Sequence, residues 1–240
     1  MRIIWNEQSI GWFRSASAYT GYNDKLSQLL LAHIPCRESL CDIGCGAGLI
    51  DLALAPFIDR ITCVDISPEA VCAVAQSARQ QGFGNIDAVC ADAGTLQGRW
   101  DTVLALFFGR YEQIPRYLPL AKERMIVAVH EQSKGCFGPA QRKREKCTDA
   151  GRVQTFLEER GIRFHTEPVE LEYGQPLRNP ADAAAFVQAY CAPMPQAELD
   201  AYLQDNLIPT GREDFPLYLP KRKRLRLFVI RRDENEAAFV

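Results

Sequence analysis

Residues 40–49 read Leu-Cys-Asp-Ile-Gly-Cys-Gly-Ala-Gly-Leu. An apolar run ends in an acidic residue, three glycines follow at alternate positions, and a helical pattern begins after them. This order predicts a buried strand, a tight turn and a helix. Glycine is needed in such a turn where the backbone takes a positive φ or where a ligand comes close. Open α/β sheets bind ligands at the carboxyl ends of their strands, so the turn is also the predicted ligand site.

Two classes of cofactor use a glycine turn after the first strand. Dinucleotide enzymes carry G-x-G-x-x-G and hold a pyrophosphate, whereas here the spacing is G-x-G-x-G and Leu49 stands at the third dinucleotide position. Asp42 precedes the first glycine by two residues and suits a cationic ligand better than a phosphate. The stretch resembles the class I S-adenosylmethionine (SAM) methyltransferases, whose first motif reads D-x-G-x-G-x-G. The resemblance implies SAM as the cofactor.

Composition sets the broad class of protein. The chain has 240 residues, 47% of them hydrophobic, and a formal net charge of −2, which favours one α/β domain and argues against a strong general attraction to nucleic acid. We find no apolar run of membrane-spanning length and no signal peptide, so we expect a cytoplasmic protein that does not bind membranes. The nine cysteines are odd in number and form no C-x-x-C, so we expect neither a disulfide framework nor a metal site.

Hydrophobic periodicity predicts alternating strands and helices. Strands are expected at 39–43, 60–64, 86–91, 100–106, 124–129, 163–172 and 224–232, with helices at 24–34, 49–56, 68–81, 114–121 and 149–160. The family resemblance implies a Rossmann-like α/β fold. Its seven-stranded mixed sheet would have the order 3-2-1-4-5-7-6, helices on both faces, and an antiparallel last strand.

We interpret the chain as a single SAM-methyltransferase domain, residues 1–240. Its parts are an N-terminal helical cap (1–35), the Rossmann-like core (36–178), a helical insertion (179–220), and the last strand with a tail (221–240). The insertion contains two helical patterns, Pro180–Tyr190 and Gln196–Leu207. We expect these helices to cover the carboxyl edge of the sheet and to shape the acceptor pocket. We expect residues 233–240 to be a frayed tail.

Acidic residues follow the first three predicted strands. Asp65 ends the second strand 23 residues after Asp42, a position from which a carboxylate accepts hydrogen bonds from a ribose diol. The resemblance implies that Asp92 and Ala93 meet the adenine, and that an N-terminal aromatic residue, Tyr19, lies near the methionine end. The full predicted cofactor set is Tyr19, Asp42, Gly44, Cys45, Gly46, Asp65, Ile66, Asp92, Ala93 and Leu106.

The fourth strand is followed by Phe107-Phe108-Gly109-Arg110-Tyr111. Enzymes of this family that methylate exocyclic amines of bases carry N/D-P-P-Y/F here, and this chain does not. It also lacks a Pro-Cys nucleophile and an acidic metal-binding set, so the strand exit predicts an apolar wall beside the methyl group. The catalytic residue stays unassigned. His130, at the end of the fifth strand, and Tyr111 are the candidates.

We therefore predict SAM-dependent methyl transfer to a small-molecule acceptor. Alternatives are an RNA or protein methyltransferase that uses the basic runs 142–146 and 221–226, and a SAM-binding protein without catalytic activity. An NAD-dependent dehydrogenase is disfavoured by the glycine spacing. We interpret the run at 221–226 as charges along an outer strand, and we do not expect nucleic-acid binding. The identity of the acceptor and the oligomeric state stay open.

Overall fold

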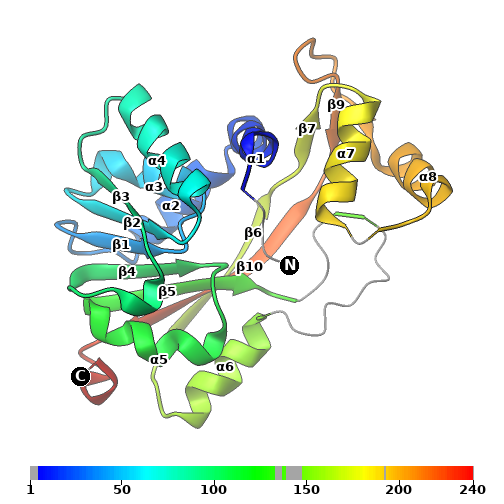
Figure 1. Ribbon diagram of the computed structural model, residues 1–240. Coiled ribbons are helices and arrows are strands. Elements are labelled where there is room, and N and C mark those ends of the chain that lie inside the picture. The colour runs from blue at the N-terminus through cyan, green and yellow to red at the C-terminus, as the bar shows by residue number, and fades with distance from the viewer. Residues whose placement is uncertain (1–4, 133–136, 139–147, 192, 240) are drawn as a thin grey trace.

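The structure is a computed structural model that describes residues 5–132, 137–138, 148–191 and 193–239. A seven-stranded sheet runs through the molecule, with helices on both sides (Figure 1). Its order, β3-β2-β1-β4-β5-β10-β6, confirms the predicted one. Strand β10 is antiparallel to both of its neighbours, as predicted, and the remaining pairs are parallel. The strands are β1 (Leu40–Ile43), β2 (Ile61–Asp65), β3 (Ile86–Cys90), β4 (Trp100–Leu106), β5 (Ala121–His130), β6 (His165–Glu172) and β10 (Arg222–Arg231).

Two hydrophobic cores lie against the two faces of this sheet. Side chains alternate between them along each strand, so that Leu40 lies in one core and Cys41 in the other. The first core packs against α2 (Tyr22–Leu31), α3 (Leu49–Leu54) and α4 (Pro68–Gln80), and the second against α5 (Ile114–Tyr117) and α6 (Ala150–Glu159). Because the central strands are buried on both sides, their sequences are almost continuously apolar. None of the helices among the described residues has the length and hydropathy needed to span a membrane.

Residues 175–219 form a separate unit, here called the insertion module. Its helices α7 (Pro180–Tyr190) and α8 (Gln196–Asn206) lie where the two helical patterns are. The module also contains a three-stranded sheet, ordered β7 (Gln175–Leu177), β9 (Leu217–Leu219) and β8 (Ile208–Pro209), which the sequence analysis did not predict. These strands have two or three residues each, too few to show a period of two.

The insertion module lies beyond the carboxyl edge of the main sheet. Strand β6 leads into the module and β10 leads out of it. The register fixes the edge, because Leu225 near the start of β10 pairs with His130 at the end of β5. The ends of β4, β5 and β6 therefore point toward the module (Figure 1).

Helix α1 (Glu7–Thr20) joins the glycine turn to the insertion module. On one side Ile10 packs with Ala47 of the turn and Ala73 of α4. On the other side the Trp12 indole Nε1 donates a hydrogen bond to Asp182 of α7, at 2.9 Å. Figure 1 shows α1 between α4 and β7. The N-terminal helix is thus in contact with both parts of the molecule.

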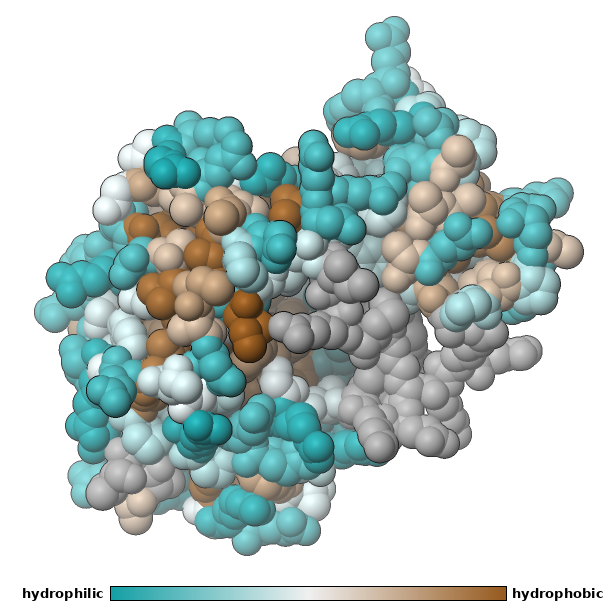
Figure 2. Space-filling model, viewed as in Figure 1, coloured by the Kyte–Doolittle hydropathy of each residue, from teal (hydrophilic) through white to brown (hydrophobic). Residues whose placement is uncertain are grey.

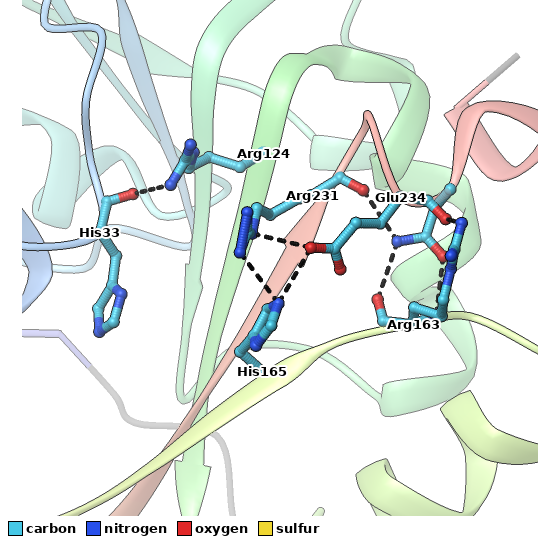
Figure 3. Close-up of polar contacts among 7 residues, drawn as sticks. His33, Arg124, Arg163, His165, Arg231 and Glu234 are labelled. Carbon is cyan, nitrogen blue, oxygen red and sulfur yellow. Dashed lines mark hydrogen bonds and ion pairs between the residues drawn. The ribbon is translucent and has the colours of Figure 1, made fainter.

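Two sequence predictions of local structure were wrong. The helix expected at 114–121 is interrupted, with 3₁₀ turns on both sides of the four-residue α5, because Pro115 and Pro119 lack the amide hydrogen that helix continuation needs. The tail is held against the rest of the chain as far as residue 235. Asn235 is buried and hydrogen-bonds the backbone of Arg163, and Glu234 pairs with His165 and Arg231 (Figure 3).

Candidate functional site

The glycine turn is built as its sequence predicted. Gly44, Gly46 and Gly48 have φ values of +77°, +56° and +66°, in the left-handed region that costs other L-residues about 1–2 kcal/mol. The amides of Gly44 and Cys45 both donate to the carbonyl of Val64, at 2.7 and 3.1 Å. These bonds fix the turn against the end of β2.

Three acidic residues lie in a row at the carboxyl edge, because β1, β2 and β3 are adjacent and parallel. Asp42 is in β1, Asp65 ends β2, and Asp92 follows β3 after one residue. The Asp65 carboxylate accepts hydrogen bonds from the Gly46 amide at 3.0 Å and the Ser67 amide at 2.9 Å. Asp65 therefore also stabilises the turn, a role that the sequence analysis did not assign to it.

The other predicted residues on this edge differ in exposure. Asp92 is exposed and caps a 3₁₀ turn by accepting from the Gly94 amide at 2.7 Å. Ile66 is 51% exposed, an unusual value for a large apolar side chain, while Ala93 is buried. Cys45 and Leu106 are half-buried. The edge thus presents an apolar side chain between two carboxylates, a combination that suits a nucleoside.

Asp42 is almost fully buried, at 2% exposure. Burial raises the pKa of its carboxyl group, and the neighbouring carboxyl of Asp51 in α3 raises the pKa further. Its Oδ1 atom accepts no hydrogen bond from a donor within the described part of the chain. A buried, unpaired carboxyl oxygen beneath the turn is consistent with a cationic group binding nearby.

Two aromatic side chains that the sequence analysis did not assign to the cofactor lie on the turn. A Cβ added to Gly44 would stand 2.0 Å from the ring of Phe108, and one added to Gly46 would stand 2.4 Å from the ring of Trp5. The sequence analysis predicted an apolar wall in the segment that follows β4, and Phe108 belongs to that segment. Trp5 gave no local signal, because only the packing of α1 brings it to the turn.

Two predicted residues are not at the turn. The ring of Tyr19 stacks on Tyr218 of β9, with centroids 4.9 Å apart. Tyr19 lies nine residues after Ile10, so the helical rise carries it about 13 Å along α1 from the turn. Tyr111 packs edge-on against Phe156 of α6 at 5.1 Å. The structure therefore places Tyr19 against the insertion module and Tyr111 in the second core.

His130 belongs to a cluster at the ends of β4, β5 and β6. Its ring lies 4.9 Å from that of Phe107, and Phe107 has a φ of +56°, the one left-handed non-glycine residue in the described chain. The ammonium group of Lys223 stands 3.7 Å from the centroid of the Phe107 ring, 4.5 Å from that of Tyr173 and 4.9 Å from that of Tyr22. Backbone strain of this kind concentrates at functional sites. We call these five residues the acceptor-side cluster.

The molecular surface also differs between the acidic row and the insertion module. Figure 2 shows hydrophobic side chains gathered where Figure 1 draws α4 and the loop after β3, on the side of the acidic row. The exposed Ile66 lies in a different loop, between β2 and α4. The surface of the insertion module in this view is more mixed. An exposed apolar side chain, Ile66, therefore lies next to Asp65 at the end of β2.

Part of the chain matches known methyltransferases in sequence. Residues 40–123 match a family model described as "Methyltransferase domain". The chain is 29% identical over 111 residues to an uncharacterized RNA methyltransferase of Streptococcus agalactiae, a match that covers 41% of this chain and 25% of that protein. The chain thus spans about a quarter of the length of the curated relatives it matches.

Solved structures of methyltransferases share the fold. The magnesium protoporphyrin IX methyltransferase of Synechocystis, with bound S-adenosylhomocysteine (SAH), superposes with a TM-score of 0.53 at 17% identity. That match covers 95% of this chain and 89% of that one. A SAM-dependent methyltransferase of Aquifex aeolicus also gives a TM-score of 0.53 at 17% identity, covering 70% and 94%.

Residues 40–123 thus match a methyltransferase domain, and the chain shares its fold with the class I SAM-dependent methyltransferases. The cofactor of that class is SAM, and the described site fits it. The Asp42 carboxyl lies unpaired beneath the turn, and Asp65 and Asp92 follow on neighbouring strands. Only glycine leaves room at the two turn positions that the aromatic rings cover.

Proposed function

We propose that this chain transfers a methyl group from SAM to a small-molecule acceptor held between the carboxyl edge and the insertion module. The observation that carries the proposal is the row of Asp42, Asp65 and Asp92 beside a three-glycine turn. In this proposal the glycine turn and Asp42 hold the methionine end. Asp65 accepts hydrogen bonds from the ribose, and Asp92 and Ala93 meet the adenine.

Bound there, SAM supplies a methyl carbon already activated by its sulfonium, so the protein contributes mainly proximity and alignment. The acceptor-side cluster provides the surfaces for this. Phe107 and Phe108 follow β4 directly and form an apolar wall, and His130 is the nearby group that takes up a proton near neutral pH. The Lys223 ammonium, surrounded by aromatic rings, favours an acceptor that carries negative charge or an oxygen nucleophile.

The insertion module supports a small acceptor. It has a core of its own, formed by Leu177, Phe186, Leu199 and Leu219 with Trp12 of α1, so it can act as a rigid cover. Its place beyond the ends of β5 and β6 limits the space in front of the acceptor-side cluster. A restricted space suits a small molecule better than a long polymer.

An RNA acceptor is the second candidate, and the name of the curated relative favours it. The charges of β10 weigh against it. Arg222 and Arg224 both pair with Glu170, and Arg226 pairs with Glu131. Strand β10 is paired on both sides, so its basic run does not lie on an outer strand. The other basic run, 142–146, lies outside the described residues.

Two measurements test the proposal. Titration calorimetry should show binding of SAH and none of NAD, and a saturating excess of about 100 Kd should stabilise the protein by about 2.7 kcal/mol. Methyl-labelled SAM should then be incubated with a low-molecular-mass cell extract and, separately, with total RNA. We expect label in the small-molecule fraction. Label in RNA alone would establish the second candidate, and binding of NAD without SAH would exclude both.

A further inference from the structure

Two buried carboxyl groups face each other beneath the glycine turn. Asp42 in β1 is 2% exposed and Asp51 in the first turn of α3 is fully buried. The two carboxyl groups are close enough to act on each other electrostatically. Asp42 Oδ1 and both Asp51 oxygens have no hydrogen-bond partner among the described residues. Two buried neighbouring carboxyl groups without donors favour a proton on one of them.

Among the described residues, no cationic side chain is found to act on the pair. The groups that act on Asp42 and Asp51 electrostatically or by hydrogen bonding include Asp65 and the thiols of Cys45 and Cys63. No lysine, arginine or histidine of the described chain is among the causes resolved for either carboxyl group. Helices α2 and α4, which pack on α3, contribute apolar side chains such as Leu26, Leu30 and Val74.

Such a pair cannot ionise fully at low cost. Burial raises the pKa of both carboxyl groups, and the charge of one opposes ionisation of the other. Two carboxyl groups this close titrate as one unit, whose second proton leaves only at a raised pH. A cation placed above them would favour the doubly ionised form and release that proton.

We propose that Asp42 and Asp51 form a carboxyl pair that carries one proton in the free protein and releases it when the ammonium group at the methionine end of the cofactor binds at the glycine turn. The inference rests on the proposed function and adds a residue, Asp51, to the site. Asp42 lies directly beneath the turn, and Asp51 acts through Asp42 as a positioning residue. The released proton goes to the solvent.

The sign of the effect follows from linkage. Binding lowers the upper pKa of the pair. Between the lowered value in the bound protein and the raised value in the free protein, the bound protein therefore holds fewer protons than the free protein. In that range the affinity for the ligand rises with pH, by at most about tenfold per pH unit. Above the raised pKa of the free pair the affinity becomes independent of pH.

Calorimetry measures the proton directly. SAH should be titrated into the protein between about pH 6 and 8, in pairs of buffers with different ionisation enthalpies, because the difference in heat gives the number of protons released. We expect release that approaches one proton at the acid end and falls as the pH rises. 5′-Methylthioadenosine, which is a thioether like SAH but lacks the ammonium group, should bind without releasing a proton.

Two variants locate the proton. Asp51→Asn leaves a single carboxyl group in the pair, so proton release and the pH dependence of affinity should both disappear. Asp24→Asn changes an exposed aspartate on α2 and should behave as the wild type. If Asp51→Asn does not fold, the comparison of SAH with 5′-methylthioadenosine on the wild type still decides the question.

The outcomes separate this inference from the proposed function. If SAH does not bind at any pH, the proposed function fails and this inference fails with it. If SAH binds without proton release in the wild type, the carboxyl pair is not the linked group and the proposed function stands. Proton release that persists in a folded Asp51→Asn variant, or that accompanies 5′-methylthioadenosine equally, would also overturn the inference.

Discussion

The two sides of the main sheet differ in how their site residues are distributed along the chain. On the cofactor side, strands β1 to β4, each site carboxylate lies within or just after its own strand, as Asp42 and Asp65 do. On the acceptor side, strands β5, β6 and β10 with the insertion module, the cluster is assembled over long separations. His130 meets Phe107 from the neighbouring strand, and Lys223 reaches Phe107 from β10.

This difference explains why one side carries motifs and the other does not. A cofactor shared by many enzymes demands the same few groups at the same strand ends, and short loops can supply them. The family match, residues 40–123, ends at the start of β5. An acceptor demands only a pocket of suitable shape, and many sequences can build one. The proposed cofactor side therefore carries the recognisable motifs, and the proposed acceptor side does not.

The largest expected effect tests whether the two sides are energetically separate. Phe186 is buried in the insertion module and packs on Trp12 and Phe137, with ring centroids 5.3 and 4.8 Å away. Phe186→Ala should lower the free energy of unfolding by about 3–5 kcal/mol, through lost contacts and a cavity. We expect the affinity of the folded variant for SAH to stay the same, by denaturant titration and calorimetry.

The control for this experiment is Gln188→Ala, which changes an exposed position on the same helix. It should leave both stability and SAH affinity within experimental error. A folded Phe186→Ala protein that no longer binds SAH would show that the module and the glycine turn act as one unit, through α1.

The second effect tests the glycine turn itself. Gly44→Ala combines a positive φ with a Cβ only 2.0 Å from the Phe108 ring. We expect a loss of about 2–5 kcal/mol in stability, from backbone strain and overpacking together, and no measurable SAH binding. Gly82 also has a positive φ, +75°, but open space around it. Gly82→Ala should therefore cost only about 1–2 kcal/mol and leave SAH binding intact.

The strands and the glycine turn could be predicted because their signals are local. Asp42, Gly44 and Asp65 are recognisable from a strand of alternating apolar residues and the loop that follows it. Trp5 and Lys223 could not be predicted as site residues, since only the packing of α1 and the pairing of β10 bring them to the edge. Tyr19 packs on Tyr218 of the insertion module, and the sequence alone does not show which turn of a helix will face a ligand.

The third effect is a loss of cofactor affinity when the Asp65 carboxylate is removed. Asp65→Ala removes the acceptor for two backbone amides and for the proposed ribose diol. We expect SAH affinity to fall by about 1.5–3 kcal/mol, or roughly 10- to 150-fold, in calorimetry. Asp87→Ala removes an exposed aspartate from β3 and should leave SAH affinity unchanged. An equal affinity for both variants would remove Asp65 from the site.

The smallest effect concerns the paired arginines of β10 and separates the two candidate acceptors. Arg222 and Arg224 are 73% and 72% exposed in their side chains and share Glu170, and exposed ion pairs of this kind contribute about 0–1 kcal/mol. The double variant Arg222→Gln/Arg224→Gln should therefore unfold at nearly the wild-type denaturant concentration and transfer methyl groups to its small-molecule acceptor at the wild-type rate.

An RNA-binding surface would behave differently. For single strands, each phosphate contact contributes about −0.7 to the slope of the logarithm of the binding constant against the logarithm of the salt concentration. Tight RNA binding by the wild type, with a steep salt dependence that becomes shallower in the variant, would favour the RNA acceptor. It would also indicate that Arg222 and Arg224 contact the RNA phosphates.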